Sequence, residues 1–331
     1  MRYLGLLLFT LVGCGSTEEK TVVVPGDCTD ATTPGDTSAE AAVDTGVDAA
    51  PGDTGVVPDA ETGTTCPIKT GGDLCAKVAK YTFPDPQVVD GVGAEFCDVP
   101  ATTFVLKDGV VPTGVTKSLL PTKVQARLAW SSQGVHAHFH VDDAEVVALP
   151  LQFYSADEVQ LFLGGSTPLY GEFSPTSKDK GFMSIRMTPP SPVPLGIPGS
   201  TEAPAAMASV SYLYKKPSAS FCTNAAVPLL APAKFAGRVV PGGYELELFV
   251  PWTLLGRTTA PTSGDQIAAN LGVGANDDPA SRTPPFDVTD PVKAGFAFWK
   301  NLPVSGAASP CCGGEAFTSC DTRTWCTPTL E

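Results

Sequence analysis

Short stretches of alternating apolar and polar residues constrain the fold of this chain more than any other feature. The clearest are VQARLAW (124–130), EVQLFL (158–163), YELELFV (244–250) and IAANLGV (267–273). Successive side chains of a strand point to opposite faces, so each stretch predicts a strand with one face in a core. The chain contains 33 Gly and 32 Pro, which break it into short elements, and no long run has the 3.6-residue period of a helix. The pattern therefore predicts an all-β fold.

A single antiparallel β-sandwich is the architecture that this pattern favours. About 230 residues of such strands fit one large sandwich, which we expect over residues 66–305. A Cys-rich segment, 306–331, should pack on it. The side chains expected on the core side are Val124, Ala126, Leu128, Trp130, Val159, Leu161, Leu163, Tyr244, Leu246, Leu248, Val250, Ile267, Ala269, Leu271 and Val273.

The first residues, MRYLGLLLFTLVGCG, have the shape of an export signal. Arg2 precedes an apolar run that is too short to span a bilayer. The run ends in Leu-Val-Gly-Cys, which resembles the lipobox of bacterial lipoproteins, where the signal is cut before the cysteine and the thiol carries a lipid. We expect residues 1–13 to be a signal peptide and Cys14 to be the lipid attachment site. Gly15 after the cysteine favours the bacterial outer membrane, on its periplasmic or surface face, and a plain signal peptide is the alternative.

Residues 14–65 have the composition of a tether. Nine carboxylates and no Lys or Arg lie between Thr21 and Thr65, and aromatic residues are absent. Such a segment buries too little surface to offset its chain entropy, so we expect it to be disordered, with a reach of roughly 40 Å. The tether accounts for most of the formal net charge of −14. Because the remainder has no basic run, a nucleic-acid partner is not expected, and the N-terminal lipid would be the only membrane contact.

The cysteine count agrees with an exported protein. Eight cysteines lie in the folded region, an even number that predicts four disulfides, although 105 pairings remain open. A zinc knuckle in the tail CCGGEAFTSCDTRTWC is the alternative, and Cys28 in the tether would stay unpaired. The disulfide candidates are Cys66, Cys75, Cys97, Cys222, Cys311, Cys312, Cys320 and Cys326.

Five segments, taken in order, resemble carbohydrate-binding module family nine and its relatives. They are VVDGVGAEFCDVP (88–100), LAWSSQGVHAHFHVDDAEV (128–146), ADEVQLFL (156–163), GGYELELFVPWTLLG (242–256) and GDQIAANLGVGANDD (264–278). The segments depart from that family where Phe96 replaces a tryptophan and Gln160 replaces a glutamate. The resemblance covers most of residues 85–300 and implies a sandwich that binds a polysaccharide or oligosaccharide.

A glycan site needs an aromatic surface and planar hydrogen-bonding groups. Trp299 in AGFAFWK is the candidate platform: if Phe296 and Phe298 face the core, its small neighbours would leave the indole open. The alternative is that Trp299 belongs to the core. The polar and aromatic candidates beside it are Tyr154, Arg186 and Asn276.

All three histidines lie in HAHFH, residues 136–140. They alternate with apolar residues and therefore share the face that points away from the core. Side chains two apart on a strand lie roughly 7 Å apart, so His136 and His138 could grip one metal ion together with a carboxylate. The alternative, which we favour, is a polar row on a solvated or sugar-facing strand.

Paired carboxylates give two further readings. The resemblance implies that Asp142, Asp143, Asp277 and Asp278 sit at strand ends, where they would cap turns or hold calcium through oxygen ligands. A glycosidase also needs two carboxylates, but no nucleophile elbow, phosphate loop or zinc-protease helix accompanies them. We therefore expect no enzyme activity and no required cofactor, with calcium as an optional ion.

The sequence thus predicts a lipid-anchored, exported, non-catalytic glycan-binding sandwich. Two other functions remain open. Relatives of the resembling fold bind haem in electron-transfer subunits, for which Met183, Met187 and His138 are available as ligands. A ligand-free module that docks other envelope proteins is the second alternative.

Overall fold

The computed structural model describes residues 69–83, 88–111, 117–148, 156–166, 181–191, 205–215, 221–223, 227–229, 231–278, 294–300 and 324–331. The predicted signal peptide, Cys14 and the tether therefore lie outside the described residues. Within the described part, no helix is long and apolar enough to cross a membrane.

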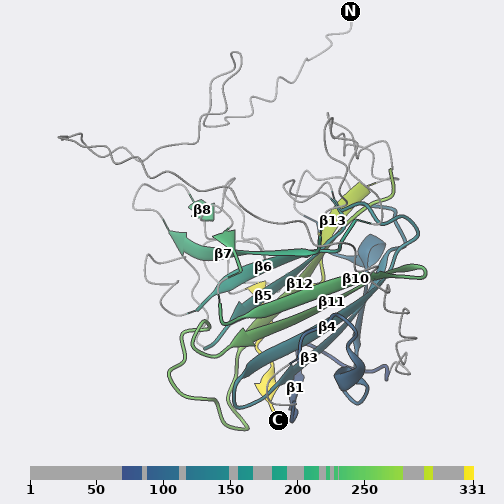
Figure 1. Cartoon of the computed structure of the whole chain (residues 1–331). Helices are drawn as coiled ribbons and strands as arrows, with labels where there is room; N and C mark the ends of the chain where they lie inside the picture. Colours follow the sequence, from purple (N-terminus) through teal and green to yellow (C-terminus); the bar gives the residue numbers. More distant parts are fainter. Residues whose placement is uncertain are drawn as a thin grey trace, which may run out of the picture. The chain divides into compact units, whose positions relative to one another are not determined.

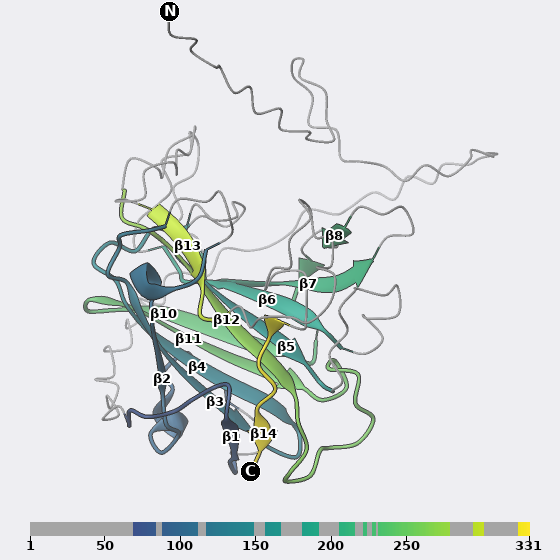
Figure 2. The ribbon, with the colours of Figure 1, turned by 180° about the vertical axis from the view of Figure 1, so that it is seen from behind.

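The predicted β-sandwich is confirmed: the described strands form two sheets that lie one behind the other (Figures 1 and 2). The first sheet has the order β10-β11-β4-β3-β1-β14, and β2 also pairs with β3. Two short 3-10 helices, η1 (Ala94–Phe96) and η2 (Leu106–Asp108), flank β2. The strands are β1 (Lys77–Lys80), β2 (Thr102–Val105), β3 (Lys123–Trp130), β4 (Gly134–Asp142), β10 (Lys234–Val240), β11 (Gly243–Pro251) and β14 (Thr329–Leu330).

The second sheet has the order β13-β12-β5-β6-β7-β8, and β9 pairs with β7. All its pairings are antiparallel among the described residues. Its strands are β5 (Glu158–Gly164), β6 (Met183–Thr188), β7 (Met207–Lys215), β8 (Phe221–Thr223), β9 (Val227–Pro228), β12 (Ala268–Asn276) and β13 (Ala294–Phe298).

The main core lies between the sheets, as the alternation predicts. Every side chain that the four stretches place on the core side is buried in one hydrophobic cluster. Burial of each large apolar side chain contributes roughly 1.5–3 kcal/mol to the stability of the fold. These four stretches supply nearly half of the buried residues of the cluster. Trp130 and Trp252 belong to this cluster as well.

Two parallel pairings depart from the predicted all-antiparallel sandwich. β1 runs parallel to β3 and also parallel to β14. β14 belongs to the segment 324–331, whose isolated bridges reach Gln266 and Ala269 at the start of β12. The described end of the Cys-rich segment therefore joins the first sheet, and Figure 2 shows it beside β1 near the C-terminus.

One predicted disulfide is present: Cys75 next to β1 is bonded to Cys326, with their Cα atoms 4.8 Å apart. Cys97 is also disulfide-bonded. Trp325, next to Cys326, is fully buried against the rings of Phe162 and Phe182. The side chains of Cys66, Cys222, Cys311, Cys312 and Cys320 lie outside the described residues.

Candidate functional site

Strand β5 presents two polar side chains on the outer face of the second sheet. Val159, Leu161 and Leu163 enter the core. Because strand side chains alternate, Glu158 and Gln160 must face outward. Both are buried nonetheless.

Arg186 of β6 joins these two residues. It stands opposite Gln160 in the register of β5 and β6. Its Nε lies 2.7 Å from Oε2 of Glu158, and the Gln160 amide Nε2 donates to Oε1 of Glu158 at 3.1 Å. Burial raises the pKa of Glu158 to about 7, while the Arg186 charge and the Gln160 hydrogen bond act to lower it. We call Glu158, Gln160 and Arg186 the polar triad.

An aromatic ring lies beside the polar triad and packs over two glycines of β12. Gly272 and Gly274 of β12 stand opposite Gln160 and Glu158. A Cβ at Gly272 would lie 2.6 Å from Cζ of Phe296, and one at Gly274 would lie 2.9 Å from Cγ of Glu158. Only glycine leaves room for Phe296 of β13 to lie against this part of the sheet. Carboxylate, guanidinium, amide and phenyl groups therefore meet on one face.

Three carboxyl groups gather where β4 and β12 end and β5 begins. We call Asp143, Asp157 and Asp277 the carboxyl cluster. Oδ1 of Asp157 accepts a hydrogen bond from the backbone N–H of Asn276 at 2.8 Å, and its Oδ2 accepts one from the N–H of Val147. These bonds tie the start of β5 to the end of β12.

Burial dominates the electrostatics of the carboxyl cluster. It raises the pKa of Asp143 to about 7, and the charge of Asp277 adds to the rise. It raises the pKa of Asp157 well above the usual range, with the charge of Asp143 acting in the same direction. Burial raises the pKa of the Tyr244 hydroxyl, with the charges of Asp157 and Asp143 acting in the same direction, and this hydroxyl has no hydrogen-bond partner among the described residues. The cluster therefore favours bound protons over free carboxylates.

The four carboxylates predicted as calcium ligands do not come together as one set. Asp143 and Asp277 meet in the carboxyl cluster, but Asp142 is partly exposed and pairs with Lys123 at 2.6 Å. The Asp278 N–H is capped by Oδ1 of Asn276 at 2.9 Å. Among the described residues, no group of three or more His, Cys, Asp or Glu side chains is arranged to hold a metal ion.

The histidines face away from the core, but the expectation of a solvated strand is wrong for two of them. His136 and His138 are buried because another part of the chain covers them. The Phe83 ring stacks on His136 with centroids 3.6 Å apart, and Phe96 lies 5.6 Å from His138. We call residues 88–99, which contain η1, the cover segment.

The buried imidazoles have protein partners on one nitrogen each. Nε2 of His136 lies 2.8 Å from Oγ of Ser131, and Nδ1 of His138 lies 3.0 Å from a guanidinium nitrogen of Arg127. Burial lowers the pKa of both histidines to about 3, so both are neutral. The proposed pair of metal ligands thus sits in a covered, hydrogen-bonded layer.

His140 is the one histidine with partial exposure. Its two nitrogens lie 3.1 Å from Asp142 and 3.2 Å from Glu245. The hydrogen bond to Glu245 raises the pKa of His140, and the charges of both acids add to this against burial.

Trp299 is partly buried and packs against the main core. Phe296 and Phe298 lie in a second cluster with Phe162, on the outer side of the sheet, while Ala297 enters the main core. The premise that both phenylalanines face the core is therefore wrong. Nζ of Lys300 lies 5.1 Å from the centre of the Trp299 ring.

The remaining sugar-site candidates are divided. Asn276 is fully buried at the end of β12, on the same face as the polar triad. Tyr154 lies outside the described residues. Glu158 and Gln160 are site residues that sequence reasoning missed. The alternation of EVQLFL already placed both on the same face of one strand, and Arg186 lies on the neighbouring strand.

The haem ligand set is not assembled. Met183 and Met187 are buried in the main core between the sheets. His138 lies on the other side of the first sheet, under Phe96. These three side chains share no common space, so this set cannot bind one haem.

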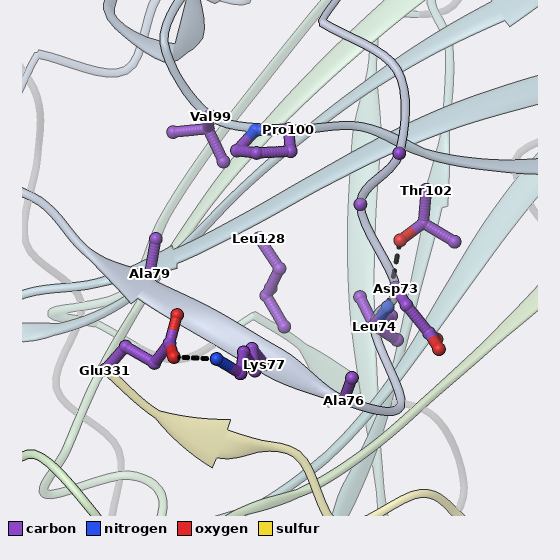
Figure 3. A pocket seen from close by; sticks show the side chains of 12 residues that line it. Asp73, Leu74, Ala76, Lys77, Ala79, Val99, Pro100, Thr102, Leu128 and Glu331 are labelled. Carbon is purple, nitrogen blue, oxygen red and sulfur yellow. Dashed lines mark hydrogen bonds and ion pairs between the residues drawn. The ribbon is translucent and has the colours of Figure 1, made fainter.

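A small pocket of about 230 Å³ opens at the edge of the first sheet (Figure 3). β3 pairs with β2 and β1 along the same edge, and Leu128 lies in the gap between them. Figure 3 shows the ion pair of Lys77 and Glu331 at this pocket. Its volume is below the roughly 300 Å³ of ordinary ligand sites, and none of the candidate site residues lines it.

Comparison with known proteins gives distant similarities. No protein-family model matches the chain, and no curated protein matches it. A family 9 carbohydrate-binding module from Caldicellulosiruptor kristjanssonii in complex with cellotriose is similar at 13% identity and a TM-score of 0.44, covering 77% of this chain and 93% of that one. A family 9 carbohydrate-binding module from the same organism in complex with glucose is similar at 13% identity and a TM-score of 0.43, covering 77% of this chain and 95% of that one. A "putative carbohydrate-binding protein" from Bacteroides uniformis gives 10% and 0.43, covering 80% and 99%. At this distance, function has to be argued from the side chains of the chain itself.

Proposed function

We propose that this chain is a non-catalytic glycan-binding protein, and that the outer face of the second sheet binds the polysaccharide or oligosaccharide. The observation that carries the proposal is the polar triad beside Phe296. Sugar hydroxyls are held by planar groups such as carboxylate, amide and guanidinium, and sugar C–H faces pack on aromatic rings. Here all four kinds of group lie on β5, β6 and β13 of one sheet, with the glycines of β12 between β5 and β13.

The triad reaches the surface through Arg186. The Arg186 side chain keeps 16% of its exposure, whereas that of Glu158 keeps none. Glu158 therefore acts mainly by holding the guanidinium in place, and Arg186 presents the triad to a ligand. Phe296 is 8% exposed at the side of this row.

A glycan array of neutral and acidic oligosaccharides, followed by titration calorimetry on the best binder, tests the proposal. Arg186→Met should weaken binding by at least tenfold. Arg238→Met is the matched control, because Arg238 is also part-buried and pairs with a glutamate at 2.8 Å, but on the first sheet. An array without binders, or equal losses in both variants, would contradict the proposal and favour the envelope-docking function. Release of reducing sugar from a bound glycan would contradict the non-catalytic role.

We also propose that the protein is exported and held at the bacterial outer membrane by a lipid on Cys14. The supporting observation is the apolar run that ends in Leu11-Val12-Gly13-Cys14. Metabolic labelling with a fatty acid should mark the wild type and Cys28→Ser but not Cys14→Ser. Labelling of Cys14→Ser would contradict the anchor.

Calcium is the ion whose preference for oxygen ligands matches the carboxyl cluster. The cluster offers two buried oxygens that have no hydrogen-bond partner among the described residues, Oδ2 of Asp143 and Oδ1 of Asp277. Its three acids are not arranged around an ion, so they would have to move and release their protons to bind one. We propose calcium as an optional ligand there and expect glycan binding to persist after treatment with a chelator. A rise of the melting temperature with calcium that survives Asp143→Asn would place the ion elsewhere.

A further inference from the structure

The cover segment is fastened to β11 through one buried side chain. The backbone N–H groups of Asp90 and Gly91 both donate to Oε2 of Glu247 at 2.9 Å. Glu247 is 1% exposed, and within the described part of the chain its Oε1 accepts no hydrogen bond. One oxygen of the Glu247 carboxyl group thus holds the cover segment, and the other is buried without a hydrogen-bond donor among the described residues.

A second carboxyl group lies on the cover segment close to the first. Glu95 belongs to η1, between two residues that contact His138: a Cβ at Gly93 would lie 2.1 Å from the His138 ring, and Phe96 lies over the same ring. His138 is the cross-strand partner of Glu247. Burial and contact with the Glu95 carboxyl raise the pKa of Glu247 to about 8, against the two backbone hydrogen bonds.

The cations on neighbouring strands have other partners. Arg127 of β3 contacts the ring of His138, and Arg238 of β10 pairs with Glu245. The residue opposite Glu247 on β10 is Ala236. His138 itself is neutral, because burial lowers its pKa to about 3. The two carboxyl groups therefore face each other without a compensating positive charge among these neighbours.

We propose that Glu95 and Glu247 share one proton, that this carboxyl pair latches the cover segment onto the first sheet, and that loss of the proton to solvent releases the segment and uncovers His138. With the proton present, one carboxyl donates to the other, which supplies the partner that Oε1 of Glu247 lacks. Without it, two carboxylates repel each other under the segment.

The direction of the pH dependence follows from linkage. The pKa of Glu247 is raised in the closed state, so the closed state holds one more proton than the open state between the ordinary carboxyl pKa of 4.5 and about 8. Closure is strongest below this window and is lost as the pH rises through it. The opening equilibrium should increase by up to about tenfold per pH unit.

Hydrogen exchange of the full-length protein tests the latch. Protection factors of the Asp90 and Gly91 amides, corrected for intrinsic exchange, should fall by at least tenfold between pH 5.5 and 8. In Glu247→Gln they should stay constant, because the amide oxygen still accepts both bonds and does not titrate. Asp98→Asn is the matched control: Asp98 is an exposed acid on the same segment, paired with Lys69, and this variant should behave like the wild type.

A second variant separates the effect of the Glu95 carboxyl on the pKa of Glu247 from the effect of burial. Glu95→Gln keeps the buried Glu247 but replaces its carboxyl neighbour with an amide donor. The midpoint of the wild-type change should move to lower pH by one unit or more. If Glu95→Gln follows the wild-type curve, or if the wild-type amides keep constant protection from pH 5.5 to 8, the proposal is overturned. Modification of His138 by diethyl pyrocarbonate should show the same pH dependence.

Discussion

Gly93 and Gly242 have the same kind of backbone but different surroundings, which makes them a test of packing over the histidine face. Both have positive φ, 64° and 82°. A Cβ at Gly93 would collide with the His138 ring, whereas nothing lies within 4 Å of one at Gly242. Gly242→Ala should lower the free energy of unfolding by about 1–2 kcal/mol from backbone strain, and Gly93→Ala by a further 1–3 kcal/mol from overpacking. Urea unfolding measures the free energy of both variants. Equal losses would mean that the cover segment shifts to make room for a Cβ at Gly93 without cost.

The Glu158–Arg186 contact makes a second prediction for single residues. Removal of one partner of a buried ion pair leaves a charge without compensation. Arg186→Met should therefore cost about 3 kcal/mol near pH 8, where Glu158 is ionised in the wild type. The double variant with Glu158→Gln should recover most of the loss, as a double-mutant cycle in denaturant would show. A cycle with no coupling energy would contradict the role of Glu158 in holding the guanidinium.

The sequence predicts the burial of a single residue correctly where only one face of its strand is covered. The alternation assigned the core side correctly, because burial between two sheets leaves a two-residue period in the sequence. Trp299 was placed with a wrong premise because AGFAFWK has large residues at alternate positions, which the pattern assigns to the core. The small Ala297 is the core residue instead, since Phe296 and Phe298 pack on the outer face with Phe162. Periodicity identifies two faces but does not say which is inner when both are covered.

The cover segment and β14 are the elements that the sequence did not predict. β14 has only two residues, too few for a period, and its partner β1 is distant in sequence. The cover segment stacks Phe96 on a histidine, a contact that no local pattern encodes. Patterns among neighbouring residues therefore do not encode the coverage of a polar face by a distant segment.

The Cys75–Cys326 disulfide should stabilise this short element. It joins residues 251 positions apart, beside β1 and just before β14. Loop-closure entropy is large for so long a loop, so Cys326→Ser should cost about 2–5 kcal/mol. The unfolding midpoint in denaturant without reductant measures the loss, and Cys28→Ser in the tether is the control. A midpoint unchanged by Cys326→Ser would show that backbone pairing alone holds β14.

At the scale of the whole molecule, buried acids should make the protein most stable in mild acid. The pKa values of Asp143 and Glu158 are raised to about 7 and that of Glu247 to about 8. A raised folded-state pKa means that the folded form binds more protons, so stability should fall as the pH rises from about 5 through 8. Thermal melts across this range measure the loss of stability. Asp143→Asn should make the part of this loss that occurs below pH 7 smaller, because Asp143 no longer titrates there. Calcium that flattens the curve in the wild type but not in Asp143→Asn would support an ion at the carboxyl cluster.

The position of β14 bears on the order in which the first sheet can be completed. Trp130 of β3 donates its indole N–H to the backbone carbonyl of Glu331 at 3.1 Å, and β1 pairs with residues 329–330. A chain that lacks residues 326–331 leaves this edge of β1 unpaired and cannot form the bond from Cys75 to Cys326. This edge of the first sheet is therefore completed only after a segment about 250 residues further along the chain has joined it.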